Sequence, residues 1–182
     1  MCFCSSHSAL LAAVYVFKKA LFLVHAISLR FSDPSHDPTA AAAIPVPDTS
    51  LLPVFSDNVL PSMLVHLGII DLSHSTSPSL AAAFPPSANV DSLLELPPAD
   101  APARGGDVPR EGPVLTEQDA YILRASAIDA CEVVVQKAQG REYGWLGKVT
   151  LPELDAWLWA GAKDRRDYRA LARFAVRNTA YF

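Results

Sequence analysis

The chain has 182 residues, of which 51% are hydrophobic and 19% are charged, and its formal net charge is −4. This length and composition suit one globular domain with a real hydrophobic core. The acidic balance excludes an extended nucleic-acid binder, which needs a basic face along the phosphate backbone. A nucleotide bound by this chain is therefore expected to be a small molecule in a pocket, and we expect a soluble, cytoplasmic protein.

Cysteine and histidine usage argues against disulfide and metal sites. The three cysteines, Cys2, Cys4 and Cys131, do not make a disulfide framework. Cys131 lies inside an apolar helical stretch, where a buried core thiol is the favoured interpretation. The five histidines have no metal-ligand spacing with each other or with a cysteine. We therefore expect neither a metal nor an organic cofactor.

The first predicted helix runs from about Leu10 to Arg30, where Phe17, Ala20, Leu21, Val24 and Ile27 recur at helical spacing. Residues 9–29 are also the one candidate membrane or targeting segment. Lys18 and Lys19 interrupt it, and two lysines at the centre of a membrane span would cost about 5 kcal/mol or more. A signal peptide would instead carry its positive charge before the apolar run. We expect a core helix whose lysines emerge at the surface, and no membrane partner.

Two polar segments flank the second predicted helix. Residues 31–50 are polar and broken by prolines, which predicts a flexible loop. The helix follows from about Leu60 to Ile70, with Pro61 in its first turn, where a missing N–H costs nothing. Its apolar stripe is Leu64, Leu67 and Ile70. Residues 72–116 are rich in Ser, Pro, Ala and Asp and bury too little apolar surface to offset their ordering entropy, so we expect a second flexible loop.

Three more helices are predicted in the remainder of the chain. The third spans Glu117 to Gln139, with Thr116 as its N-cap, and Gly140 ends it. The fourth begins at Leu151-Pro152 and runs through residue 164, and a shorter one is expected over 168–176. No stretch alternates as a strand does. The predicted fold class is therefore all-α, with a long disordered insertion.

Several charged residues stand inside strongly apolar helical patterns. Arg124 and Glu132 are two turns apart on broadly the same side of one helix. An isolated charge in the interior is strongly disfavoured, so both need a partner. They either face a polar pocket that binds a ligand or form a structural pair, with the arginine reaching the surface. Asp155 and Asp164 likewise either orient a ligand or pair with neighbouring arginines at the surface. The residues alone favour the structural alternative in both cases.

Asp57 comes just before the helix that Pro61 opens. Backbone N–H groups and the helix dipole stabilise an anion there, so the carboxylate is expected to remain ionised. Such a group can stabilise positive charge that develops in a transition state. It can also be a capping residue and nothing more, and the residues alone favour capping.

A family resemblance adds to this picture. The stretch VFSDNVLPSMLVHLGIIDLS resembles the FADxxLPxxLxHLGxL segment of the queuosine 5′-phosphate N-glycosylase/hydrolases, the queuosine salvage family. Upstream, VFKKALFLVHAI looks like the family's FYKRAQILVADxW helix. Downstream, ILRASAIDACEVVV resembles IRxxxxxxxE, LDAWLWAGAKD is similar to LDxxLWxxxxD, and RNTAYF resembles the Arg-rich, aromatic C-terminus. The resemblance spans 14–182 and leaves 1–13 unmatched, so we expect a C-terminal portion of the family's domain.

The resemblance implies a helical fold similar to that of the helical DNA glycosylases. It implies hydrolysis of the N-glycosidic bond of queuosine 5′-phosphate, which releases queuine for tRNA modification, with no cofactor. Asp57 would be the catalytic carboxylate, stabilising an oxocarbenium-like ribose or directing a water onto C1′. Queuine is a 7-deazapurine and cannot be protonated at N7, so other hydrogen bonds must assist its departure. The implied substrate-binding residues are Phe55, Arg124, Glu132, Asp155 and Asp164, with Lys18 or Lys19 and Arg177 as phosphate contacts.

The chain also departs from the family's pattern. Ile122 stands where an acidic residue is usual, and Lys163 stands where histidine is frequent. The family's helical region upstream of the first matched helix has no counterpart in 1–13. A truncated, non-enzymatic helical interaction module is therefore the alternative function. A membrane-anchored helix followed by a soluble tail is the third.

Overall fold

The computed structural model describes residues 5–31, 46–84, 90–95, 111–140 and 144–177, with the side chains of 5–17 and 145 left aside. Its helices are α1 (Ser5–Phe31), α3 (Val59–His66), α4 (Pro78–Ala81), α5 (Val90–Leu94), α6 (Glu117–Gln139), α7 (Leu151–Asp164) and α8 (Arg166–Arg169), with a 3-10 turn at Gly144–Lys148. The strands are β1 (Glu111–Leu115) and β2 (Arg173–Val176). The described chain is mostly helical, as predicted, but the expectation of no strand is wrong.

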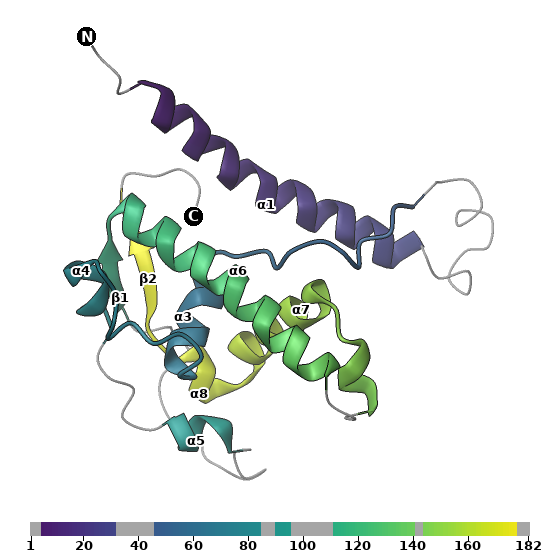
Figure 1. Ribbon diagram of the computed structural model, residues 1–182. Coiled ribbons are helices and arrows are strands. Elements are labelled where there is room, and N and C mark those ends of the chain that lie inside the picture. Colours follow the sequence, from purple (N-terminus) through teal and green to yellow (C-terminus); the bar gives the residue numbers. More distant parts are fainter. Residues whose placement is uncertain (1–4, 32–45, 85–89, 96–110, 141–143, 178–182) are drawn as a thin grey trace.

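Helix α3 lies at the centre of the fold, in contact with α6, α7 and β2 (Figure 1). Nearly all of its side chains are buried, including the polar Ser62 and His66. Each of these two has a partner: the Ser62 hydroxyl donates to the Asn58 carbonyl at 2.7 Å, and His66 Nε2 lies 2.8 Å from the Ala172 carbonyl. A short helix is stable here because its packing offsets the cost of nucleating it.

The second helix ends four residues earlier than the sequence suggests, because Gly68 has a φ of 70° and leaves the helical region. The Ile69 N–H donates a hydrogen bond to the Leu64 carbonyl at 2.9 Å. This bond satisfies a carbonyl group in the last turn of the helix that would otherwise have no partner. Ile70 still packs against the core as expected, although it lies outside the helix.

Helices α6 and α7 begin and end as predicted, because both carry explicit capping residues. The Thr116 hydroxyl accepts the Asp119 N–H at 3.1 Å, and the Glu153 carboxylate accepts the Thr150 N–H at 2.8 Å. Cys131 of α6 is fully buried in the core with Leu60 and Leu64, which confirms the prediction of a core thiol. Burial raises the pKa of its thiol to about 12.

The two strands pair in parallel, with Glu111 opposite Arg173 and Leu115 opposite Val176. The predicted helix over 168–176 is therefore wrong: α8 is a single turn, and an extended strand follows it. Gly112 permits the close approach, because a Cβ there would overlap the Arg173 backbone. The pairing buries Phe174 completely, and that burial outweighs the helical preference of the segment.

Parts of the expected loop over 72–116 are ordered. Leu80 of α4 and Phe84 are buried in a second core cluster with Leu115 and Phe174. Asp119 fastens this segment, since its carboxylate accepts hydrogen bonds from Ser77 and Ser79, each at 2.7 Å. The prediction of a flexible loop is thus wrong for 72–84, 90–95 and 111–116, while 85–89 and 96–110 lie outside the described residues. It is also wrong for residues 46–50, where Thr49 is buried.

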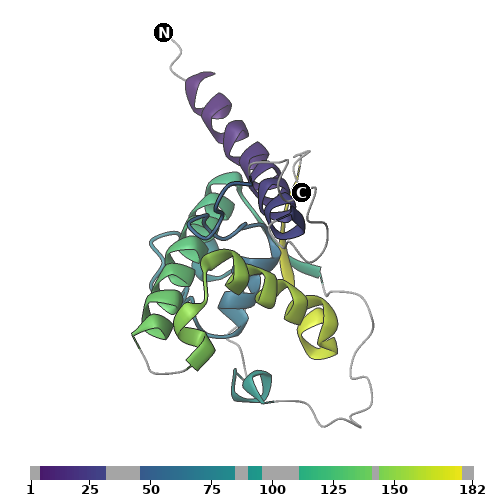
Figure 2. The same ribbon diagram turned by 90° about the vertical axis from the view of Figure 1, so that its right-hand side faces the viewer.

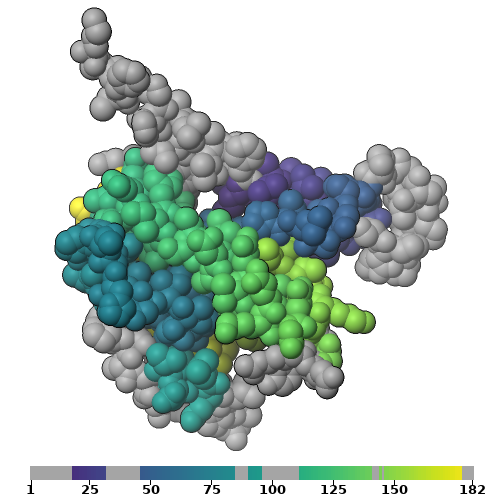
Figure 3. Space-filling model, viewed as in Figure 1, coloured from purple at the N-terminus to yellow at the C-terminus, as the bar shows by residue number. Residues whose placement is uncertain are grey.

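The later part of α1 lies beside the segment that leads to Phe55 (Figure 3), and the earlier part of its backbone extends away from the other elements (Figure 2). For the described side chains of α1, 18–31, the prediction of a core helix is wrong. Leu23 and Leu29 are 59% and 63% exposed, whereas the buried side chains within 18–31 are the polar His25 and Ser28. Val24 and Ile27 of the expected apolar stripe are exposed as well. Among the described residues, no helix has the length and apolar character to cross a membrane.

Candidate functional site

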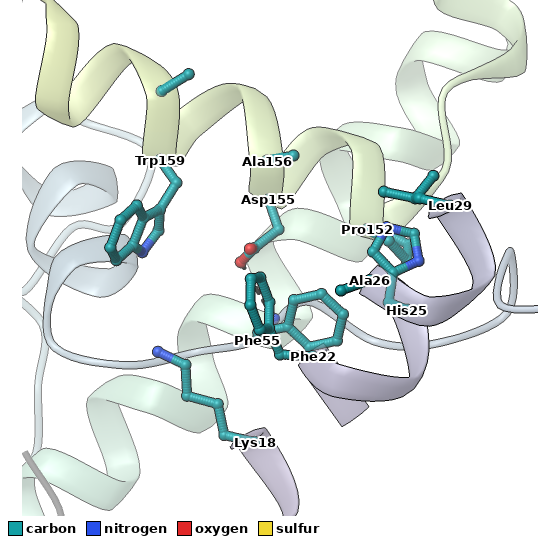
Figure 4. Close-up of a pocket in the computed structure, with 11 residues that line it drawn as sticks. Lys18, Phe22, His25, Ala26, Leu29, Phe55, Pro152, Asp155, Ala156 and Trp159 are labelled. Atoms are coloured by element: carbon teal, nitrogen blue, oxygen red, sulfur yellow. Dashed lines mark hydrogen bonds between the residues drawn. The ribbon is translucent and has the colours of Figure 1, made fainter. Parts of the chain in front are cut away.

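A cavity of about 470 Å³ opens between α1 and α7. Three aromatic side chains, Phe22, Phe55 and Trp159, form much of its wall, and its polar lining residues are Lys18, His25 and Asp155. Figure 4 shows Lys18 and Trp159 toward one end, His25 and Pro152 toward the other, and Asp155 between them. The lining residues of α1 are Lys18, Phe22, His25, Ala26 and Leu29, which recur once per turn and therefore share one face of the helix.

Asp57 lies behind the Lys18 end of this cavity, in a side chain that is 18% exposed. Its Oδ1 accepts hydrogen bonds from the N–H groups of Val59 and Leu60, at 2.7 and 3.2 Å. These are backbone N–H groups of the helix start, which are expected to stabilise the carboxylate. Its Oδ2 lies 2.6 Å from Lys18 Nζ and accepts a longer hydrogen bond, 3.4 Å, from Trp159 Nε1. The carboxylate is therefore a capping group and an ion-pair partner, held in a fixed orientation by two backbone and two side-chain donors.

Lys18 does not simply emerge at the surface. Its side chain is 30% exposed, and it closes one end of the cavity while pairing with Asp57. Arg173 also lies within electrostatic reach of Asp57, and desolvation lowers the pKa of this guanidinium. Two cations, Lys18 and Arg173, therefore lie near one carboxylate, Asp57. The excess positive charge makes this end of the site suitable for an anionic group of a ligand.

Asp155 is the buried carboxyl group of the cavity, at 5% exposure. Burial, assisted by the charge of Asp57, raises its pKa to about 6, although the Phe55 N–H and Lys18 act in the opposite direction. The Phe55 N–H donates to Asp155 Oδ1 at 3.1 Å (Figure 4). Asp155 therefore exchanges a proton near neutral pH, which is the range in which a carboxyl group can act as both donor and acceptor.

Trp159 lines the cavity and contacts Asp57 behind it. Its indole N–H reaches Asp57, and Lys163 Nζ lies 3.8 Å from the centre of its ring on one face. The cation–π contact and the hydrogen bond together fix the plane of the indole. A fixed aromatic plane beside Phe55 is suited to a flat ligand.

The structure brings together four of the predicted site residues, Asp57, Phe55, Asp155 and Lys18. Arg124 contacts the Phe174 ring, 5.8 Å from its centre, and its carbonyl accepts the Ser56 hydroxyl, so it is near the site without lining the cavity. Glu132, Asp164 and Arg177 are exposed and do not line the cavity. The expectation that Arg124 and Glu132 face one pocket is wrong, because Glu132 is exposed; eight residues make more than two full turns and leave the two side chains about 80° apart around α6.

Sequence reasoning did not identify Phe22, His25 and Trp159 as site residues. A signal for the first two was present: positions 18, 22, 25 and 29 follow the helical period, and the resemblance already pointed to Lys18. Among the described residues, no three His, Cys, Asp or Glu side chains are grouped so that they would hold a metal ion. Comparison with protein-family models, with curated proteins and with solved structures found no match. The case for a function therefore rests on the geometry of the cavity and of its two carboxylates.

Proposed function

We propose that this chain hydrolyses the N-glycosidic bond of queuosine 5′-phosphate and releases queuine, within a helical domain of the DNA-glycosylase type. The observation that carries the proposal is the Asp57 carboxylate. It is oriented by two backbone N–H groups at 2.7 and 3.2 Å, and its other oxygen contacts Lys18 and Trp159, which line one end of an aromatic cavity. A glycosidase needs such a carboxylate because its transition state carries positive charge on the sugar ring.

The cavity suits the flat base of a nucleotide. Its volume of about 470 Å³ falls within the range of small-molecule sites, which are mostly apolar with a few placed polar groups. Phe55 and Trp159 offer ring faces for stacking. Asp155 offers a carboxyl group to the polar edge of the base, and its proximity to half-protonation lets it donate or accept there.

The reaction divides between the two carboxyl groups. Lys18 leaves Asp57 Oδ2 and binds the 5′-phosphate, so that this oxygen faces C1′ of the ribose. As the C1′–N bond breaks, its electrons leave with the base and Asp57 stabilises the cationic sugar. Protonated Asp155 donates its proton to the departing base, so that the ring of the base leaves uncharged, and water then adds to C1′ and gives its own proton to the Asp57 carboxylate.

The direct experiment incubates the purified chain with queuosine 5′-monophosphate and measures free queuine by chromatography. Asp57→Asn is expected to lower the rate by about 1000-fold or more, because the ionised group that stabilises the transition state is gone. Asp71→Asn is the matched control, since Asp71 also accepts a backbone N–H, from Ser73 at 2.9 Å, but is exposed and does not line the cavity. Absence of release by the unaltered chain, or undiminished release by Asp57→Asn, contradicts the proposal.

A non-enzymatic helical interaction module is the second candidate, and the exposed face of α1 favours it. Leu23, Val24 and Ile27 lie on a face of α1 that does not line the cavity and are 59%, 38% and 37% exposed, and an exposed group of apolar side chains is a candidate contact surface. A thermal melt separates the two functions. An enzyme of this kind is stabilised by queuosine 5′-monophosphate, since a ligand that binds only the folded state raises the melting temperature. An interaction module is not.

A further inference from the structure

His25 is a buried polar residue of the cavity to which the proposed reaction gives no role. Its side chain is 8% exposed and lines the end of the cavity opposite Lys18 (Figure 4). Nδ1 lies 2.8 Å from the Thr49 hydroxyl, and the ring packs 5.7 Å from that of Phe55. These two contacts fix the ring. Nε2 has no hydrogen-bond partner among the described residues, and so it is left for a ligand.

A second pocket, of about 340 Å³, begins on the other side of His25. The two cavities share His25 and Leu29 in their walls. The second pocket is more polar than the first, and its lining residues include Asp48 and Glu153 but no lysine or arginine. The Ser50 N–H holds the pKa of Asp48 below its usual value, so this side chain is an anion at neutral pH.

We propose that His25 is a specificity-determining residue between two subsites of a single ligand. The aromatic part of the ligand occupies the first cavity, and a hydroxylated, positively charged arm passes His25 into the acidic second pocket. This inference rests on the proposed function, which determines the orientation of the ligand in the cavity. The ribose is bound at the Lys18 and Asp57 end, and the far edge of the base therefore faces His25.

The chemistry of the second pocket defines the arm. A protonated amine is attracted by Asp48 and Glu153, and hydroxyl groups can exchange hydrogen bonds with His25 Nε2 and with the hydroxyl-rich wall. An unsubstituted base cannot make the hydrogen bond to His25 Nε2 or the contacts with the two carboxylates, so it is expected to bind more weakly than a base with the arm. Queuine carries an amine-linked ring with hydroxyl groups and thus meets both requirements.

The test compares two ligands on the full chain: queuosine 5′-monophosphate, and 7-deazaguanosine 5′-monophosphate, which has the same ring and sugar phosphate without the arm. Calorimetry measures the dissociation constants. The unaltered chain is expected to prefer the ligand with the arm by about tenfold or more, the worth of one charge-assisted hydrogen bond. His25→Ala is expected to reduce that preference to about threefold or less by weakening the ligand with the arm more than the other.

A second variant tests the same preference independently, so that the inference can still be judged if His25→Ala does not fold. Asp48→Asn combined with Glu153→Gln keeps side-chain oxygens that accept the Ser50 and Thr150 N–H groups while removing both charges. It is expected to reduce the preference in the same direction, with a melting temperature close to that of the unaltered chain. Asp71→Asn is again the control and retains the full preference.

The outcomes separate this inference from the proposed function. Preference for the ligand with the arm, without any release of base, contradicts only the proposed hydrolysis. Release of base with equal affinity for the two ligands, or a preference that survives both variants, contradicts only the role of His25. If neither ligand binds, both are overturned.

Discussion

Helices α3 and α1 have similarly apolar sequences and opposite environments. Helix α3 is enclosed by α6, α7 and β2, and nearly all of its side chains are buried. The described part of α1 exposes Leu23 and Leu29 and buries His25 and Ser28 instead. Polar contacts orient α1: His25 with Thr49, and Ser28, which donates to the Pro47 carbonyl at 3.2 Å. Apolar composition therefore predicts that a helix forms, but the available partners decide which face it buries.

The largest expected effect contrasts one leucine from each helix. Leu64→Ala in α3 removes a side chain that is 1% exposed, and it is expected to lower the free energy of unfolding by about 2 to 5 kcal/mol, through lost transfer energy and a residual cavity. Leu23→Ala in α1, at 59% exposure, is expected to change it by no more than about 0.5 kcal/mol. Urea unfolding followed by circular dichroism measures both. A comparable loss in Leu23→Ala would mean that the outer face of α1 is covered in solution.

The second prediction concerns Asp155, which lines the cavity between α1 and α7. Burial raises the pKa of Asp155 to about 6 in the folded protein, whereas an unfolded aspartate titrates at about 4. The folded state holds the proton more tightly, so this group's contribution to stability falls as pH rises from about 4 to 6 and stays low above that window. Asp155→Asn keeps an acceptor for the Phe55 N–H and is expected to be more stable than the unaltered chain at about pH 7.5, by on the order of 2 kcal/mol.

Denaturant unfolding at several pH values tests this sign. The advantage of Asp155→Asn should shrink as the pH falls and should be nearly absent at about pH 4, where the native carboxyl group is already neutral. An advantage that is independent of pH would mean that the charge of Asp155 is not the cause.

A smaller effect is expected where α1 contacts the segment around Thr49, which follows it in the chain. Thr49→Val removes the hydroxyl partner of His25 Nδ1 with little change in shape, and it is expected to cost about 1 kcal/mol. Because the bond joins α1 to the Thr49 segment, amide hydrogen exchange should increase in α1 and remain unchanged in α3. Equal acceleration in both helices would indicate that they unfold as one unit.

The smallest predicted effect concerns the ion pair between Lys18 and Asp57. Lys18 lies at the other end of the α1 face that carries His25. Lys18→Gln removes the partner of Asp57 and is expected to cost about 1 kcal/mol or less, because the pair is partly open to solvent. Lys19→Gln is the matched control, since Lys19 is exposed and does not line the cavity. The difference between the two variants should diminish as salt is added. A difference that persists at high salt would argue for packing of the Lys18 stem rather than for its charge.

The predictable elements were those with local signals. Thr116 and Gly140 fix the ends of α6 without help from the rest of the fold, and the Thr150 capping box fixes the start of α7. The strands carry no such signal: β1 contains Gly and Pro, and β2 follows directly on a helical turn. Each strand exists because the other pairs with it, and a distant partner leaves no mark on the local pattern.

The candidate site likewise contains residues that the sequence predicted and residues that it did not. Asp57 and Asp155 lie at positions defined by a helix start and by a family resemblance; Asp155 lines the cavity, and Asp57 contacts Lys18 and Trp159 of its lining. Glu132 was placed by helical spacing and by the same resemblance, but these specify a side of α6 and not what covers it, and Glu132 is exposed. His25 escaped notice because a lone histidine in an apolar helix is usually a core residue, and only the position of Thr49 shows which of its nitrogens is left over.

The parallel pairing of β1 with β2 has a consequence for how the protein is made. Phe174 is fully buried among Leu80, Leu115 and Leu123, yet it is synthesised after all three of them. Until Phe174 leaves the ribosome, the nascent chain carries these leucines without the ring that covers them, a state in which chains are prone to aggregate or to recruit chaperones. Completion of this core therefore depends on a long-range contact, and a ribosome that pauses before Arg173 holds a chain in which one side of the core is uncovered.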